Sequence, residues 1–181
     1  VAVVLMVCSG ASEISMAQWA SAFVESALGF SKTVCDLAGP CLFGITMGIC
    51  RVFYGKFGEK VDLSKFMIGS GLLCLICYLL ASLSKNPVAA LIGCIMCGFS
   101  IAIMWPGTLS ISSKKIPAGG TAMFALLAMA GDLGGSIGPS SVGMISQKAG
   151  DNLQYGLFFG GIFPVVLVVF LIVLKFMKEK E

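Results

Sequence analysis

The stretch from Met129 to Pro139 reads Met-Ala-Gly-Asp-Leu-Gly-Gly-Ser-Ile-Gly-Pro and sets one carboxylate, Asp132, among glycines in an otherwise apolar run. A charge in hydrocarbon is costly, so such a residue usually faces a bundle interior or a water-filled cavity. Glycines on the same helix let neighbouring backbones approach closely. The stretch therefore predicts a membrane helix that lines a transport pathway, with Asp132 as its functional side chain.

Long apolar blocks on both sides of this stretch predict an all-α membrane protein. The 181 residues are 57% hydrophobic and 12% charged, which is about half the charge of a typical soluble domain. Apolar stretches of about 20 residues, the length that crosses a ~30 Å hydrocarbon core, occur six times. They cover approximately residues 1–27, 33–55, 63–84, 87–111, 119–147 and 153–175. The connections are too short for a soluble domain, so we expect one six-helix bundle over residues 1–181.

The placement of lysine and arginine predicts the orientation of the bundle. Six spans put both termini on one side, and that side would carry nine of the twelve basic residues. These are Arg51, Lys56, Lys60, Lys65, Lys114, Lys115, Lys175, Lys178 and Lys180, against Lys32, Lys85 and Lys148 on the other side. Because basic residues concentrate in cytoplasmic loops, we expect both termini in the cytoplasm and a multi-pass protein of the cytoplasmic membrane. The basic residues are a topology signal, and no nucleic-acid partner is expected.

The cysteines do not predict a metal site. Cys74 and Cys77, with Cys94 and Cys97, have the spacing of a four-cysteine zinc template. Both pairs lie inside apolar runs without a turn that would gather four thiolates, and cysteine in such a run is a small apolar residue. The chain has no histidine, and no nucleophile–base pair can be assembled. We expect no metal, no cofactor and no enzymatic activity.

The first span becomes polar after an apolar start. At ~100° per residue, Glu13 and Trp19 share a face with serines at positions 9, 12 and 15, and Gln18 lies at its edge. Glu13 lies about 18 Å from the cytoplasmic end, close to the bilayer middle. An acid, an amide and an indole suit a polar ligand such as a sugar, because the ring also covers its apolar face. For the serines, hydrogen bonding between helices is the alternative.

The fourth and fifth spans add two further candidates. Pro106 removes a backbone donor and predicts a kink, and broken helices are tolerated at such depth where they line a cavity. Trp105 is then a cavity residue, with an interfacial anchor as the alternative. Asp132 lies ~20 Å from the cytoplasmic end of its span, at the level of Glu13. These two acids are the candidates for proton coupling.

The second span carries features that do not depend on the cavity. Gly44 and Gly48, four residues apart, predict a small-residue packing face. Asp36 follows Lys32 by four residues, which fits either a local ion pair or a role in the cavity. Toward the cytoplasm, the glycines at positions 55 and 58 predict a tight turn.

That cytoplasmic segment resembles the loop motif Gly-x-x-x-Asp-Arg-x-Gly-Arg-Arg of the major facilitator superfamily, at the place where the motif belongs in the second six-helix half. The matching positions are Arg51, Gly55, Lys56, Gly58 and Lys60. Arg51 replaces the first Gly, Gly55 replaces the Asp, and Glu59 replaces an Arg.

Further motifs are similar to the fucose-permease-like sugar:proton symporters of that superfamily. They are Gly98-x3-Ala102-x3-Pro106, Gly120-Thr121-Ala122, Gly131-x2-Gly134-Gly135-x3-Pro139, and Gly10-Ala11-x-Glu13 followed by Trp19. The resemblance implies a twelve-helix transporter with alternating access, of which this chain is the C-terminal half and an N-terminal six-helix half is the partner. Val1 opens inside an apolar run without a charged n-region, which argues against a signal peptide and predicts a chain cut from a longer one.

The main functional hypothesis is secondary transport of a sugar or similar small polar solute, coupled to protons. Its substrate contacts are Glu13, Gln18, Trp19, Trp105 and Asp132. An exporter of drugs or an importer of organic anions is the alternative, and the anion case is weakened because no cation is expected at mid-depth. A non-transporting membrane scaffold is a second alternative, and it predicts that Glu13 and Asp132 pair across helices with no cavity between them.

Overall fold

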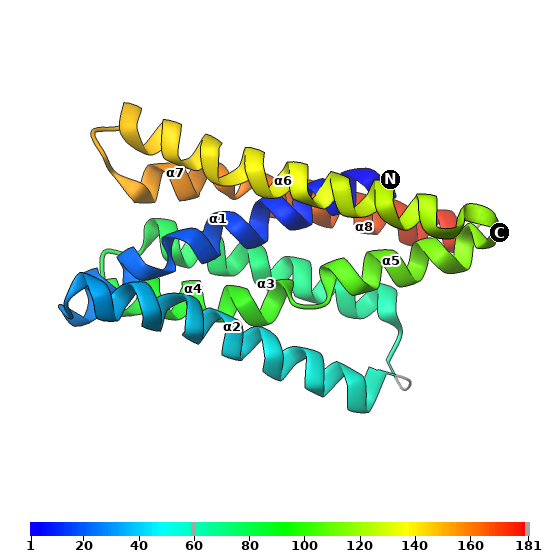
Figure 1. Ribbon diagram of the computed structural model, residues 1–181, viewed down its shortest axis with the longest axis horizontal. Helices are drawn as coiled ribbons and strands as arrows, with labels where there is room; N and C mark the ends of the chain where they lie inside the picture. Colours follow the sequence, from blue (N-terminus) through cyan, green and yellow to red (C-terminus); the bar gives the residue numbers. More distant parts are fainter. Residues whose placement is uncertain (59–60, 180–181) are drawn as a thin grey trace.

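The computed structural model describes residues 1–58 and 61–179, and every regular element in those ranges is helical. Six stretches are long and apolar enough to cross a membrane, which confirms the predicted fold class (Figure 1). The elements are α1 (Ala2–Leu28), α2 (Lys32–Phe57), α3 (Leu63–Leu83), α4 (Pro87–Ile101), α5 (Met104–Lys115), the short 3₁₀ helix η2 (Pro117–Gly119), α6 (Gly120–Lys148), α7 (Leu153–Gly160) and α8 (Ile162–Glu179).

Two of the six spans are interrupted about one turn before a proline. Between α4 and α5 the break falls at Ala102 and Ile103. Pro106 has no backbone N–H and cannot donate to the carbonyl four residues earlier, which is that of Ala102. The predicted kink is therefore confirmed, and its centre lies upstream of the proline because that is where the hydrogen bond is missing. The break between α7 and α8 has the same relation to the proline of the sixth span.

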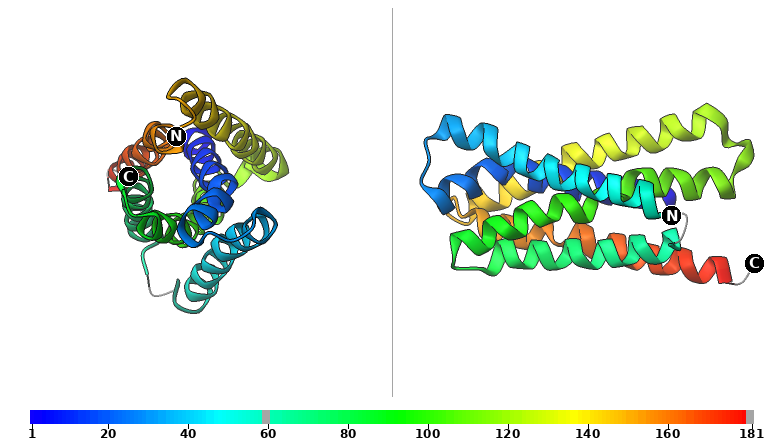
Figure 2. Two further views of the ribbon diagram at one scale, coloured as in Figure 1. Left: turned by 90° about the vertical axis from the view of Figure 1, so that its left-hand side faces the viewer. Right: turned by 90° about the horizontal axis from the view of Figure 1, so that it is seen from below.

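Helix α1 packs against α2, α4, α5, α6 and the α7–α8 span. Figure 2 (left) shows α2 and α6 outside the ring that the other helices form. Of the most apolar window in each of these two spans, 22% is buried, against 50% for α1 and 61% for α4–α5. The two marked termini lie at the same end of the bundle (Figure 1), as an even number of spans requires.

Glycines bring the backbones of α1 and α6 into direct contact. A Cβ added to Gly134 would lie 2.0 Å from the carbonyl oxygen of Val7, and one added to Gly10 would lie 2.1 Å from that of Gly131. No side chain fits at these positions, because the obstructing atoms are backbone. The glycines between Met129 and Pro139 therefore form a helix-packing surface.

The first half of helix α2, next to its connection to α1, is the part that packs against α4. Thr46 Oγ1 donates to the Ile95 carbonyl of α4 at 2.7 Å. Gly98 of α4 lies against the same part of α2, where an added Cβ would be 2.4 Å from the Phe43 carbonyl oxygen. Beyond this contact α4 gives way to α5, and α2 diverges from α5 toward the end of the bundle that holds the termini (Figure 1).

The remaining predictions for α2 meet different outcomes. Gly44 and Gly48 are exposed, and an added Cβ at either would meet nothing within 4 Å in the described chain. The predicted packing face is therefore wrong within this bundle. Asp36 accepts a hydrogen bond from Ser21 of α1, so its carboxylate connects two helices. Within residues 1–58 and 61–179 the structure describes no ion pair between Asp36 and Lys32.

The buried core between α1, α3 and α4 contains polar and sulfur atoms at fixed positions. The Tyr78 hydroxyl donates to the Ser12 carbonyl at 2.7 Å. The Cys74 and Cys97 sulfur atoms lie 3.8 Å apart across α3 and α4. All eight cysteines are free, and Cys41 is exposed whereas the other seven are buried.

Candidate functional site

Glu13 lies half-buried on α1, at the margin of the polar face predicted for that helix. The serines at 9, 12 and 15 on the same face are fully buried inside the bundle. Ser12 Oγ donates to the Cys8 carbonyl of its own helix at 2.8 Å, and the other two hydroxyls have no partner among the described residues. The polar face thus divides into a buried serine strip and an accessible carboxylate.

Arg51 belongs to the last turns of α2, but its side chain reaches the middle of the membrane span. Its Nε donates to the Ala102 carbonyl at 3.2 Å, and Ala102 lies near the centre of the span Pro87–Lys115. This is the carbonyl that Pro106 leaves without a helical donor, so Arg51 replaces the missing hydrogen bond. The expectation that no cation lies at mid-depth is therefore wrong, because a long side chain carries its charge away from its own Cα.

The rest of the predicted loop motif is largely helical. Gly55 and Lys56 lie in the last turn of α2, and Gly58 has φ −62° and ψ −27°, which is right-handed helical geometry. The predicted turn begins at Gly58, whose carbonyl accepts from the Val61 N–H at 3.2 Å. Gly55 instead lies inside the helix, and Gly58 does not adopt a conformation that needs glycine. Lys60 lies outside the described residues. The functional role of the motif stays a prediction.

Trp105 begins the first turn of α5 and lies against α6. A Cβ added to Gly131 would be 2.5 Å from two ring carbons of Trp105, so the absence of a side chain there makes room for the indole. The ring packs against a small core cluster of Met6, Leu127 and Ala130. Its Nε1 is buried and has no hydrogen-bond partner among the described residues. A buried indole N–H normally has one.

Trp19 and Gln18 line a groove between α1 and α6. The groove has a volume of about 600 Å³, and α6 contributes Ser136, Ser140 and Gln147 to its lining. The Trp19 Nε1 is also buried without a partner in the part of the chain that the structure describes. The structure thus brings two of the five predicted contact residues together. Glu13 and Asp132 lie on the same two helices outside the groove, and Trp105 lies on α5.

Asp132 is exposed on α6, one turn before the groove. Ser136 Oγ donates to the Asp132 carbonyl at 3.1 Å, and Ser140 Oγ donates to the Ser136 carbonyl at 2.7 Å. These residues are four apart and therefore form one polar stripe along the helix. Across the described residues, no hydrogen bond joins the carboxylates of Asp132 and Glu13. The pairing that a scaffold protein requires is not observed.

The sequence did contain a signal for the residues that were missed. Asp132, Ser136 and Ser140 repeat at a spacing of four, which marks one helical face, and Gln147 continues it two turns later. Our prediction followed the glycines and the acid and overlooked the hydroxyls. No local pattern indicated the position of the Arg51 guanidinium, because it depends on how closely α2 approaches α4.

Comparison with known proteins agrees with this architecture. The sequence profile of the Major Facilitator Superfamily matches residues 1–181. An uncharacterized MFS-type transporter of Yersinia pestis is 23% identical over 145 residues, which cover 80% of this chain and 38% of that relative. The chain therefore matches well under half of the relative's length. No solved structure matches significantly.

Proposed function

The chain belongs to the Major Facilitator Superfamily, and from this premise we propose that it is one half of a proton-coupled transporter for a sugar or a similar small polar solute. Membership of this family supports a membrane transporter and points away from an enzyme. The substrate class, the proton coupling and the cytoplasmic-membrane location belong to the proposal.

The observation that carries the proposal is the pair of unpartnered indole N–H groups. Trp19 and Trp105 each hold a buried Nε1 without a hydrogen-bond acceptor. Leaving such a donor unsatisfied costs about 1–3 kcal/mol, so a native protein needs a reason for each one. A hydroxyl-rich solute in the groove supplies an acceptor for Trp19, and Gln18 with the α6 serines supplies further polar partners there. Trp105 does not line the groove and stays a predicted contact.

Glu13 and Asp132 are the proposed proton-coupling and substrate-binding acids. Both lie on membrane spans without a partner carboxylate, and ionisable residues in such spans mark ion and substrate pathways. Protonation lowers the cost of carrying a carboxylate through a water-poor intermediate. Each acid would then be neutral in one half of the transport cycle.

A second six-helix half is the proposed partner. The relative is much longer than this chain, and the outer faces of α2 and α6 are largely uncovered. Transporters with repeated halves bind their substrate near the bilayer midplane and rock one half against the other. We propose that residues 1–181 act as one such rocking unit.

Uptake by the intact protein that carries this chain tests the proposal. A panel of labelled sugars and carboxylates first identifies the solute. Trp19→Phe and Trp105→Phe keep the aromatic ring and remove the N–H, so each should raise KM by up to ~10-fold at equal expression. Tyr155→Phe, an exposed aromatic on α7, is the matched control and should leave KM unchanged. An unchanged KM in both Trp variants contradicts the proposed contacts.

The two acids are tested by pH dependence. Asp132→Asn and Glu13→Gln should lower accumulation against a gradient and flatten its response to external pH. If both variants accumulate solute with the wild-type pH profile, neither acid couples protons.

A second candidate substrate class is organic anions, and Arg51 is the observation that favours it. With Nε held by Ala102, the other guanidinium donors stay available for a carboxylate near mid-depth. Arg51→Gln separates the two classes: uptake of an anionic solute should be lost, whereas uptake of a neutral sugar should survive. Arg51→Lys should retain part of the anion uptake, because the charge remains and the bidentate geometry does not.

A further inference from the structure

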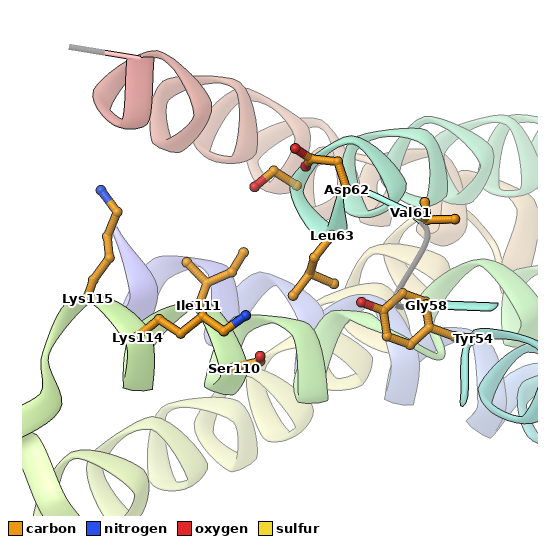
Figure 3. Close-up of a pocket in the computed structure, with 10 residues that line it drawn as sticks. Tyr54, Gly58, Val61, Asp62, Leu63, Ser110, Ile111, Lys114 and Lys115 are labelled. Atoms are coloured by element: carbon orange, nitrogen blue, oxygen red, sulfur yellow. The ribbon is translucent and has the colours of Figure 1, made fainter. Parts of the chain in front are cut away.

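A second groove, away from the α1–α6 site, follows the divergence of α2 from α5. Its mouth is a pocket of about 360 Å³ between α2, α3 and α5, shown in Figure 3. A deeper pocket of about 380 Å³ continues between α2 and α5. Tyr54, Leu63 and Ser110 line both pockets, so the two form one continuous groove.

The groove changes chemistry with depth. At the mouth, Lys114 extends its ammonium into the pocket toward Leu63 and Tyr54, whereas Lys115 extends away from it (Figure 3). The Tyr54 hydroxyl and Ser110 add polar atoms there. Asp62 is the acid at the mouth, and its carboxylate caps α3 by accepting from the Lys65 backbone N–H at 3.1 Å.

The deeper part of the groove is mostly apolar. Its lining includes Gly55 of α2 and Ile103, Pro106 and Gly107 around the helix break. Arg51 also lines this part, and its Nε donates to the freed Ala102 carbonyl. Pro106 is eight residues from Lys114, so the apolar part extends about 12 Å deeper than the lysine along the helix axis.

We propose that this groove binds one anionic phospholipid, with the phosphate on Lys114 and Tyr54 and an acyl chain along Gly55 and Pro106. The span Pro87–Lys115 ends at the lysines, which sets them at the level of lipid headgroups. The end that holds the termini and most basic residues is the cytoplasmic one by the positive-inside rule. Basic pockets between membrane helices on that side bind anionic headgroups, and the apolar continuation fits a lipid better than a free phosphate.

Native mass spectrometry of the intact protein tests the headgroup contact. The protein is delipidated and then equilibrated with dioleoyl-phosphatidylglycerol or dioleoyl-phosphatidylethanolamine. Lys114→Gln should weaken retention of the phosphatidylglycerol by ~5-fold, the effect of one basic residue at an anionic lipid surface. Lys114→Arg should retain the lipid, which separates loss of charge from misfolding. Lys85→Gln is the matched control, since Lys85 lines a pocket at the opposite end of the bundle.

A second pair of variants tests the acyl-chain contact. Gly55→Leu adds a side chain that projects into the deeper groove, and its Cβ meets nothing within 4 Å in the described chain. It should reduce phosphatidylglycerol retention at least as much as Lys114→Gln. Gly44→Leu, equally open and on the same helix, should leave retention unchanged.

Five outcomes overturn the proposal. Two concern the variants: equal losses of phosphatidylglycerol from Lys114→Gln and Lys85→Gln, and wild-type retention in Gly55→Leu. Two concern the wild type alone: equal retention of the two lipids, and no retained phosphatidylglycerol. The fifth is full displacement of phosphatidylglycerol by millimolar glycerol 3-phosphate. Displacement by the soluble phosphate would make this a phosphate site. Wild-type protein without retained phosphatidylglycerol would mean that another part of the protein covers the groove. Transport activity is not the readout, so these results are independent of the proposed function.

Discussion

The two helices at the edge of the bundle are held in different ways. Helix α6 lies on α1 through glycines whose missing side chains are replaced by the backbone of the other helix, as at Gly134. Helix α2 is held in its first half, by Gly39 against the α1 backbone and by the Thr46 hydrogen bond, and its glycines at 44, 48 and 55 face open space. The difference shows that glycine in a membrane helix has no fixed meaning. It joins two helices where a backbone lies opposite and leaves a groove where none does.

The largest expected loss of stability comes from adding a side chain at the close contact between α1 and α6. Gly134→Val places a branched side chain where an added Cβ already lies 2.0 Å from the Val7 carbonyl oxygen. Because backbone has to move, we expect a loss of about 3 kcal/mol, the upper end for overpacking. The yield of monodisperse protein and its melting temperature measure this. Gly44→Val is the control on α2, and an equal loss there would remove the distinction between the two helices.

The next largest loss of stability comes from removing the hydrogen-bond donor at the break between α4 and α5. Arg51→Ala leaves the buried Ala102 carbonyl without a donor, which should cost about 2 kcal/mol of stability. Arg51→Lys restores a donor and should recover part of it. Thermal unfolding of the three proteins ranks them, and identical melting temperatures would show that the carbonyl finds another partner.

A smaller effect comes from loosening α2. Thr46→Val keeps the shape of the side chain and removes its hydrogen bond to the Ile95 carbonyl, at a cost of about 1 kcal/mol. Hydrogen exchange should quicken for α2 amides and remain unchanged for α6 amides. Faster exchange in both helices would mean that the two edges are coupled.

The smallest effect is a gain. Gly48→Ala adds a methyl group in open space on α2 and replaces the poorer helix former. The free energy of unfolding should therefore rise by about 0.5–1 kcal/mol, measured as a higher melting temperature. A clear loss would indicate that a partner covers this face in the intact protein.

Sequence patterns predicted the features that depend on composition and spacing along one helix. The six membrane-length helices and the proline interruption in the fourth span follow from apolar length and from the missing N–H of Pro106. The superfamily follows from the loop motif that begins at Arg51, whereas the sugar-symporter branch, indicated by glycine and proline motifs such as the one around Gly134, stays a prediction. These features are local, so neighbouring helices do not alter them.

Features that depend on the approach of two helices were not predictable in this way. The same pattern, glycines four residues apart, packs tightly in α6 and is open at Gly44 and Gly48. The Arg51 guanidinium lies near mid-depth because α2 lies beside the break at Ala102, and nothing near position 51 encodes that. The α6 hydroxyls at Ser136 and Ser140 are an intermediate case. Their spacing along one helix face was predictable, whereas the groove that they line also requires the approach of α1.

The burial of the cysteines gives the bundle a built-in reporter. Seven thiols lie inside the packed helices, and Cys41 is exposed on α2. A maleimide dye should therefore label Cys41 on the loosely held edge helix when water reaches that face, without any engineered cysteine. The fluorescence of that dye would then follow whatever approaches or leaves the uncovered face of α2 as the protein works.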